Sequence, residues 1–253
     1  MQIILGITIP FIGTTLGSAM VFFMKKHINK KVEKLLLGFS AGIMISASVW
    51  SLIIPSIELS KKEYIITWLP STIGFIIGIL FLILANNLSK KLTIFKEKSN
   101  MRNTIMLIFA VTIHNIPEGM AVGIAIAGAI SNNNLITMAS AITLAIGISI
   151  QNFPEGAIIS LPLKSKGISK IKSFYYGTLS GIVEPISSII TLVLSNFIRK
   201  LLPYLLSFAA GAMMFVVAYD LIPEAKDKEN SYFGILGITT GFLIMMILDI
   251  SLG

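Results

Sequence analysis

The sequence contains no cysteine among its 253 residues and only two histidines. Without cysteine, the chain can form neither disulfides nor thiolate metal sites. Charged residues are also scarce, at 13% of the chain against 55% for hydrophobic residues. A soluble globular domain has about 25% charged residues. The chain therefore lacks the polar surface of an ordinary soluble domain and has the composition of an integral membrane protein.

Apolar runs of roughly 20 residues recur along the chain, and each is long enough to cross a hydrocarbon core about 30 Å thick. Short alternating segments typical of a membrane β-barrel are missing, which favours helices. We therefore expect an all-α membrane protein with almost nothing left over for a soluble domain. The eight predicted spans lie at about residues 2–24, 35–59, 64–88, 104–130, 135–163, 173–198, 201–225 and 231–252.

The formal charge of +8 first suggests nucleic acid as a partner. Its distribution contradicts this, because the odd-numbered connections between spans hold 16 of the Lys and Arg residues and the even-numbered ones hold 4. By the positive-inside rule, the odd connections are cytosolic and both termini lie outside the cytosol. We expect a lipid bilayer and no nucleic acid as partner. The composition, without cysteine and rich in Lys and Ile, suits a bacterial plasma (inner) membrane.

Two segments resemble each other at an offset of 169 residues: GFSAGIMISASVWSLIIPSIE (38–58) and SFAAGAMMFVVAYDLIPEAKD (207–227). In the predicted topology they run in opposite directions. This predicts an inverted repeat of helices 1–3 against helices 6–8, arranged around central helices 4 and 5. The alternative is that small-residue patterns such as Ser-Ala-Gly only provide helix-packing surfaces.

Polar motifs interrupt the fourth and fifth spans, with HNIPEG at 114–119 and QNFPEG at 151–156. An ionisable side chain in mid-membrane costs roughly 2.5 to 3.5 kcal/mol and is tolerated where it faces partners or a water path. At about 100° per residue, Glu118 falls between His114 and Asn115 around its helix, so its carboxylate can reach groups on either side. The same arrangement recurs one helix later in Gln151, Asn152 and Glu155, and the sixth span adds Glu184.

These groups lie at similar depths. A rise of about 1.5 Å per residue puts His114, Gln151 and Glu184 roughly 15, 18 and 17 Å from the inner ends of their spans, so they converge near the midplane. Pro117 and Pro154 lack an N–H, and each frees the carbonyl four residues earlier. Local unwinding there would expose further oxygen ligands.

Imidazole, carboxylate and amide oxygens without thiolate suit Zn²⁺, Fe²⁺ or Mn²⁺ better than Cu⁺. Two or three carboxylates also neutralise a divalent charge without burying an excess. The alternative for a single motif is structural: a His–Glu hydrogen bond, with Pro and Gly forming a kink that packs. Two copies of the motif, with a third carboxylate at matching depth, favour metal coordination.

With HNIPEG, QNFPEG and the Val-Glu-Pro at 183–185, the sequence resembles the ZIP (Zrt-, Irt-like) divalent metal transporters, especially their GufA-like bacterial branch. The segments at 46–58 and 210–225 resemble that branch's second and seventh helices. The resemblance covers essentially the whole chain. It implies a single transmembrane transporter domain over 1–253, with eight helices enclosing a binuclear centre and metal moving toward the cytosol.

The resemblance also implies two neighbouring metal sites that share Glu118 and Glu155. One contains His114, Glu118, Gln151 and Glu155, and the other contains Asn115, Glu118, Asn152, Glu155 and Glu184. The better-known family pattern in the fifth helix is HEIPHE, so QNFPEG replaces one imidazole and one acidic ligand with amides. Zinc, iron, manganese and cadmium all stay open as cargo. The connection at 89–103 lacks a histidine run, so no cytosolic metal-sensing loop is expected.

Four other acidic residues within the predicted spans lie away from the midplane. Glu58, Asp220 and Glu224 are near span ends, where they line entry and exit vestibules or simply mark the membrane interface. Asp249, near the end of the last span, is predicted to be interfacial.

We therefore predict a transporter, not an enzyme, with Zn²⁺ or another divalent ion as cargo and two ions bound. The alternative is a membrane-embedded binuclear metalloenzyme that activates water for hydrolysis. Such an enzyme needs an H-E-x-x-H helix or a separate nucleophile and base, and neither is present. An exposed face of small residues permits a homodimer. Proton coupling, and the choice between channel and alternating-access carrier, stay open.

Overall fold

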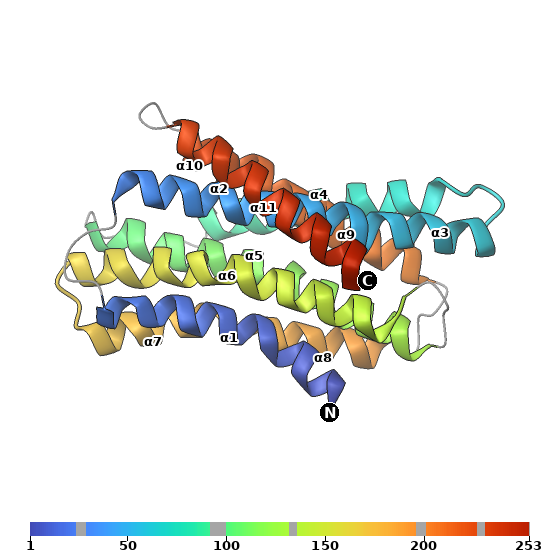
Figure 1. The fold of residues 1–253 in the computed structure, drawn as a ribbon, viewed down its shortest axis with the longest axis horizontal. Helices are drawn as coiled ribbons and strands as arrows, with labels where there is room; N and C mark the ends of the chain where they lie inside the picture. The colour runs from blue at the N-terminus through green and yellow to red at the C-terminus, as the bar shows by residue number, and fades with distance from the viewer. Residues whose placement is uncertain (24–28, 92–99, 132–135, 196–200, 227–230, 253) are drawn as a thin grey trace.

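The computed structural model describes residues 1–23, 29–91, 100–131, 136–195, 201–226 and 231–252 (Figure 1). These ranges contain helices and no strand. In chain order the elements are α1 (Gln2–Phe23), α2 (Lys30–Ala47), the π-helix η1 (Ser48–Ile53), α3 (Ile54–Glu63), α4 (Leu69–Lys91), α5 (Asn100–Ile130), α6 (Met138–Ser165), α7 (Lys170–Gly181), α8 (Val183–Ser195), α9 (Leu202–Val216), the π-helix η3 (Val217–Leu221), α10 (Ile222–Ala225) and α11 (Ser231–Leu252).

The prediction of eight spans is confirmed, because eight helical stretches of the described chain are long and apolar enough to cross a membrane. Three of these stretches combine shorter elements: α2, η1 and α3 form the second, α7 and α8 the sixth, and α9, η3 and α10 the seventh. Both termini lie toward the same end of the bundle, as an even number of crossings requires (Figure 1).

The helices form two groups, which Figure 1 shows one above the other. The first group contains α1, α5, α6, α7 and α8, within which α1 packs most extensively on α6 and α5 on α8. The second contains α2, α3, α4, α9, α10 and α11, within which α2 packs on α11 and α4 on α9. Contacts between the groups are fewer and run mainly through α2 with α6 and α5 with α9.

This grouping follows the predicted inverted repeat. The repeat relates span 1 to span 6, span 2 to span 7, span 3 to span 8, and span 4 to span 5. When each span is exchanged for its counterpart, each group keeps the same members. The exchange also turns the α2–α11 pair into the α9–α4 pair, and the α1–α6 pair into the pair formed by the sixth span and α5. Of the α5 and α6 spans, 71% and 67% is buried, against 17% of α11, so the fourth and fifth helices are central as predicted.

Two π-helices mark equivalent positions in the repeat. They begin at Ser48 and Val217, which are 169 residues apart, the offset of the sequence similarity. Each ends two residues before a proline, Pro55 or Pro223. A π-helix shifts the backbone hydrogen bonds by one residue and occurs often at functional sites. The repeat is predicted from the sequence, whereas this change of helix type is not.

The structure shows no unwinding at Pro117 or Pro154, because α5 and α6 continue as helices through these prolines. The break lies in the sixth span instead, where α7 ends at Gly181 and α8 begins at Val183. Pro185 explains it: the ring has no N–H to donate to the carbonyl of residue 181 and disfavours helical geometry in the residue before it.

Glycines allow the closest helix pairs to approach. A Cβ at Gly13 or Gly17 of α1 would overlap the backbone carbonyl of Ser149 or Phe153 on α6, and one at Gly156 would overlap that of Thr14. Gly42, in the Ser-Ala-Gly pattern of α2, meets the carbonyl of Ile238 in the same way. The small-residue pattern therefore has a packing role as well as belonging to the repeat.

Candidate metal centre

The carboxylates and amides of the two motifs meet inside the first helix group. Side chains from α5, α6 and α8 form a cluster with almost no exposed surface, although it lies within membrane-spanning helices. Asn115, Glu118, Gln151, Asn152 and Glu184 are 0% exposed, and Glu155 is 7% exposed. Burying charged and amide groups in this way is expensive unless they are paired or bind an ion.

Glu118 of α5 is held by the amide of Gln151 on α6. Gln151 Nε2 donates to Glu118 Oε1 at 2.6 Å and lies 3.4 Å from Asn152 Oδ1. The Asn152 amide also lies near the carboxylates of Glu118 and Glu184, but its nitrogen makes a well-formed hydrogen bond with neither. The fourth and fifth spans are thus joined through the motif residues.

Glu184 of α8 is held from two other helices. Thr14 Oγ1 on α1 donates to Glu184 Oε1 at 2.8 Å, and Asn115 Nδ2 on α5 donates to the same oxygen at 2.9 Å. Asn115 Nδ2 also lies 3.2 Å from the carbonyl oxygen of Ser180, next to the break between α7 and α8. Because Glu184 is in the first turn of α8, the unpaired N–H groups at that helix end favour its negative charge.

Glu155 lies between these two networks. Its carboxylate is close enough to those of Glu118 and Glu184 to interact with both electrostatically. Three carboxylates near one another in a buried site repel when ionised, and a divalent cation among them removes that repulsion.

Several buried atoms of this cluster have no hydrogen-bond donor. The unsatisfied oxygens are Glu118 Oε2, Glu184 Oε2, Asn115 Oδ1 and Gln151 Oε1. Buried acceptors are normally paired, so each needs an explanation. The side-chain nitrogen of Asn152, Nδ2, is also unpaired. Rotating this amide by 180° would place its oxygen where the nitrogen now lies. The donor set is therefore rich in hard oxygen ligands and fits a divalent cation.

His114 belongs to α5, but its side chain lies outside the described part of the structure. Among the side chains that are described, no three of His, Cys, Asp or Glu form a cluster that could hold a metal ion by themselves. The amide oxygens therefore have to contribute to any ion site formed by the described residues.

Comparison with known proteins shows the family of the chain. A family model described as ZIP zinc transporter matches residues 87–249. The chain is 34% identical over 330 aligned residues to zinc transporter ZIP11 of Xenopus tropicalis, covering 100% of this chain and 98% of that one. The chain belongs to the ZIP family. Among other relatives in the family, zinc transporter GufA of Myxococcus xanthus is 29% identical over 95% of this chain and 96% of its own, and zinc transporter ZupT of Streptococcus mutans is 34% identical over 93% and 92%.

Membership of the ZIP family decides between the two functional hypotheses. The family comprises transporters of divalent metal and is not enzymatic. The hydrolase alternative finds no support in these relatives.

Two residues near the site were not predicted from the ZIP-like motifs. Thr14 holds Glu184, and Ser40 Oγ of α2 donates to the backbone oxygen of Gln151 at 3.0 Å, which links the two helix groups beside the site. Both are buried hydroxyls in apolar spans. In the sequence, Thr14 and Ser40 are only weak indications of a role at the site. Ser and Thr in apolar helices often form hydrogen bonds with the backbone of their own helix without further function.

The acidic residues near span ends differ in environment. Glu58 pairs with Lys61 at 2.7 Å, and both side chains are well exposed, as expected of an interfacial residue. Asp249 also has a structural contact inside the protein. It accepts a 2.6 Å hydrogen bond from Ser51 of η1, which connects α11 to the second span. Asp220 and Glu224 lie in η3 and α10 at the end of the seventh span.

Proposed function

We propose that this chain carries divalent transition-metal ions, with zinc as the main cargo, across a membrane toward the cytosol. The observation behind the proposal is the set of buried carboxylate and amide oxygens that have no donor. A cation satisfies such oxygens and compensates the nearby carboxylates. The names of the relatives, which are zinc transporters, support zinc as the cargo.

We further propose that two ions bind side by side with Glu118 and Glu155 between them. The predicted ligands of the first are His114, Glu118, Gln151 and Glu155; those of the second are Asn115, Glu118, Asn152, Glu155 and Glu184. The separation of the described hydrogen bonds into a Gln151–Glu118 pair and an Asn115–Glu184 pair supports this division. On binding, the amides would turn their oxygens toward the ion.

The grouping of the helices supports alternating access over a fixed open channel. All the proposed ligands lie on α5, α6 and α8, within the first group, and the second group meets them through few contacts. Movement of the first group relative to the second would carry the whole site with its ligands intact. The Ser40–Gln151 bond would then be broken and remade during transport.

The orientation is also a proposal. The Lys and Arg distribution places the odd-numbered connections in the cytosol and both termini outside it, in the plasma membrane of a bacterium. A homodimer formed through exposed helix faces is compatible with this arrangement.

Flux of zinc into proteoliposomes tests the function. We expect Glu118→Gln and Glu155→Gln each to reduce the initial rate to that of protein-free liposomes, because the exchange keeps the side-chain volume and removes one negative charge. Glu58→Gln, in the exposed pair with Lys61, is the matched control and should keep the wild-type rate. Wild-type flux in the two site variants, with all proteins equally inserted, would refute the proposal.

A further inference from the structure

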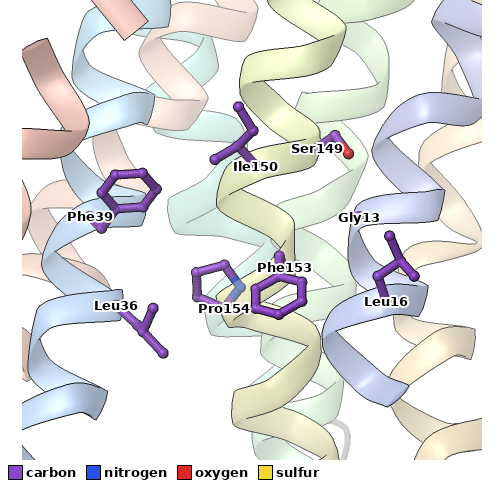
Figure 2. Close-up of a pocket in the computed structure, with 8 residues that line it drawn as sticks. All are labelled: Gly13, Leu16, Leu36, Phe39, Ser149, Ile150, Phe153 and Pro154. Atoms are coloured by element: carbon purple, nitrogen blue, oxygen red, sulfur yellow. The ribbon is translucent and has the colours of Figure 1, made fainter. Parts of the chain in front are cut away.

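An apolar groove of about 340 Å³ lies between α1, α2 and α6. Figure 2 shows Leu36 and Phe39 of α2 on the left, Phe153 and Pro154 of α6 in the middle, and Leu16 of α1 on the right. Of its eight lining residues, Ser149 alone has a polar side chain. Leu16 is 57% exposed in the middle of its span, so the groove opens toward lipid. Its size is within the range of about 300 to 1,000 Å³ for ligand pockets.

The depth of the groove can be read from its position on α2. At about 1.5 Å per residue, Leu36 and Phe39 lie roughly 9 and 14 Å from Lys30, where α2 begins. Half of the hydrocarbon core is about 15 Å thick. An acyl chain extending from a headgroup at the level of Lys30 therefore reaches the full length of the groove.

Lysines lie at that end of all three helices that form the groove. Lys30 and Lys31 are exposed in the first turn of α2, and Lys166 is exposed directly after α6. Lys170 Nζ donates to the carbonyl oxygen of Phe22 at the end of α1, at 3.1 Å. Lysines next to a membrane surface attract anionic lipids.

We propose that the groove binds one acyl chain of an anionic phospholipid from the lysine-rich leaflet, with the phosphate of its headgroup at Lys30 and Lys166. The apolar lining and the lipid-facing opening fit a hydrocarbon chain, and the lysines supply complementary charge. A second copy of this chain is disfavoured as the occupant, because about 340 Å³ is less than the volume of two turns of a helix roughly 10 Å in diameter.

The bound chain would lie against the contact between the two helix groups. Phe39 precedes Ser40, whose hydroxyl donates to Gln151, and Phe153 and Pro154 precede Glu155. A lipid that binds only this arrangement of the groups stabilises it over any arrangement in which α2 and α6 have moved apart. The lipid therefore slows the movement of the site.

Photolabelling tests the binding. The full chain is placed in phosphatidylcholine nanodiscs containing a trace of phosphatidylglycerol with a diazirine on its acyl chain, and labelled peptides are mapped by mass spectrometry. We expect label to concentrate at residues 36–39 and 149–154, and unlabelled phosphatidylglycerol to compete about tenfold better than added phosphatidylcholine.

Variants distinguish lipid binding in the groove from general contact between lipid and the exposed helix faces. Leu36→Trp and, from the opposite wall, Leu16→Trp should fill the groove and abolish its labelling, whereas Leu80→Trp, 50% exposed on α4, should not. Lys30→Gln with Lys166→Gln should remove the preference for phosphatidylglycerol, whereas Lys62→Gln at the other end should keep it. Even labelling of all exposed faces, absence of label at the groove because a second copy of the chain covers it, or equal competition by both lipids would overturn the proposal.

The effect on transport rests on the proposed function and is measured separately. Zinc flux should be slower in vesicles that contain phosphatidylglycerol than in pure phosphatidylcholine, and Leu36→Trp should lose this difference while Leu80→Trp keeps it. Equal wild-type flux in both lipids would overturn the slowing effect. Absence of any flux would instead count against the proposed function, because the labelling does not depend on transport.

Discussion

Thr14 lies outside the metal-binding motifs, yet it fixes a carboxylate of the site. Its hydroxyl donates to Glu184 Oε1 at 2.8 Å. We expect Thr14→Val, which keeps the shape but loses the donor, to weaken zinc binding about tenfold, as for other residues that orient metal ligands. Thr14→Ser keeps the hydroxyl and should bind zinc almost as the wild type does. Isothermal titration of the purified proteins measures both, and equal affinities in all three would contradict the role assigned to Thr14.

Gln151 tests how the amides affect metal choice. Its Oε1 is buried without a donor, so it is available as a hard, neutral ligand. Replacing it by His adds an imidazole, which suits zinc better than manganese. We expect Gln151→His to increase the preference for Zn²⁺ over Mn²⁺ in competition uptake by about tenfold. An unchanged preference would show that residue 151 does not contact the cargo.

At the scale of single elements, contact between α1 and α6 depends on glycine. A Cβ at Gly17 would overlap the backbone carbonyl of Phe153, whereas one at Gly6 would meet only side-chain atoms of Ile126, the nearest at 3.0 Å. We expect Gly17→Ala to destabilise the protein by about 1–3 kcal/mol and to lower its melting temperature in detergent. Gly6→Ala, on the same helix, should melt close to the wild type. Identical melting of the two variants would exclude close packing as the reason for Gly17.

The elements differ in how well the sequence predicts them. Hydropathy located all eight spans, because a run of some 20 apolar residues has few alternatives to crossing a bilayer. The motifs likewise predicted that Glu118, Gln151 and Glu184 would lie near one another. Proline positions alone did not show where a helix breaks: α5 and α6 continue through theirs, while α7 ends at Gly181, four residues before Pro185. Packing by neighbouring helices decides this, and a single sequence does not reveal it.

The contacts of Thr14 and Ser40 could not be predicted for a related reason. Each joins residues more than 100 positions apart. Predicting them requires knowing that α1 contacts α8 and that α2 contacts α6, and tertiary packing sets both contacts. The ligand role of His114 stays a prediction, because its side chain lies outside the described residues.

At the scale of the whole molecule, the absence of cysteine makes the orientation testable, since each single-cysteine variant carries one thiol. A membrane-impermeant maleimide applied to intact cells should label Gln2→Cys and leave Lys166→Cys unlabelled until the cells are opened. The physical reason is the excess of Lys and Arg in the odd-numbered connections. If only Lys166→Cys is labelled in intact cells, the orientation of the chain in the membrane is opposite to the one proposed.

We propose that Glu118 and Glu155 together hold two cargo ions, next to buried oxygens that have no hydrogen-bond partner. The most direct measurement is the number of zinc ions bound per chain at saturation, determined by mass spectrometry of the intact protein with and without Glu118→Gln. We predict two ions in the wild type, and fewer than two in the variant because both sites share that carboxylate. Two ions in both proteins, bound with the same affinity, would contradict the claim.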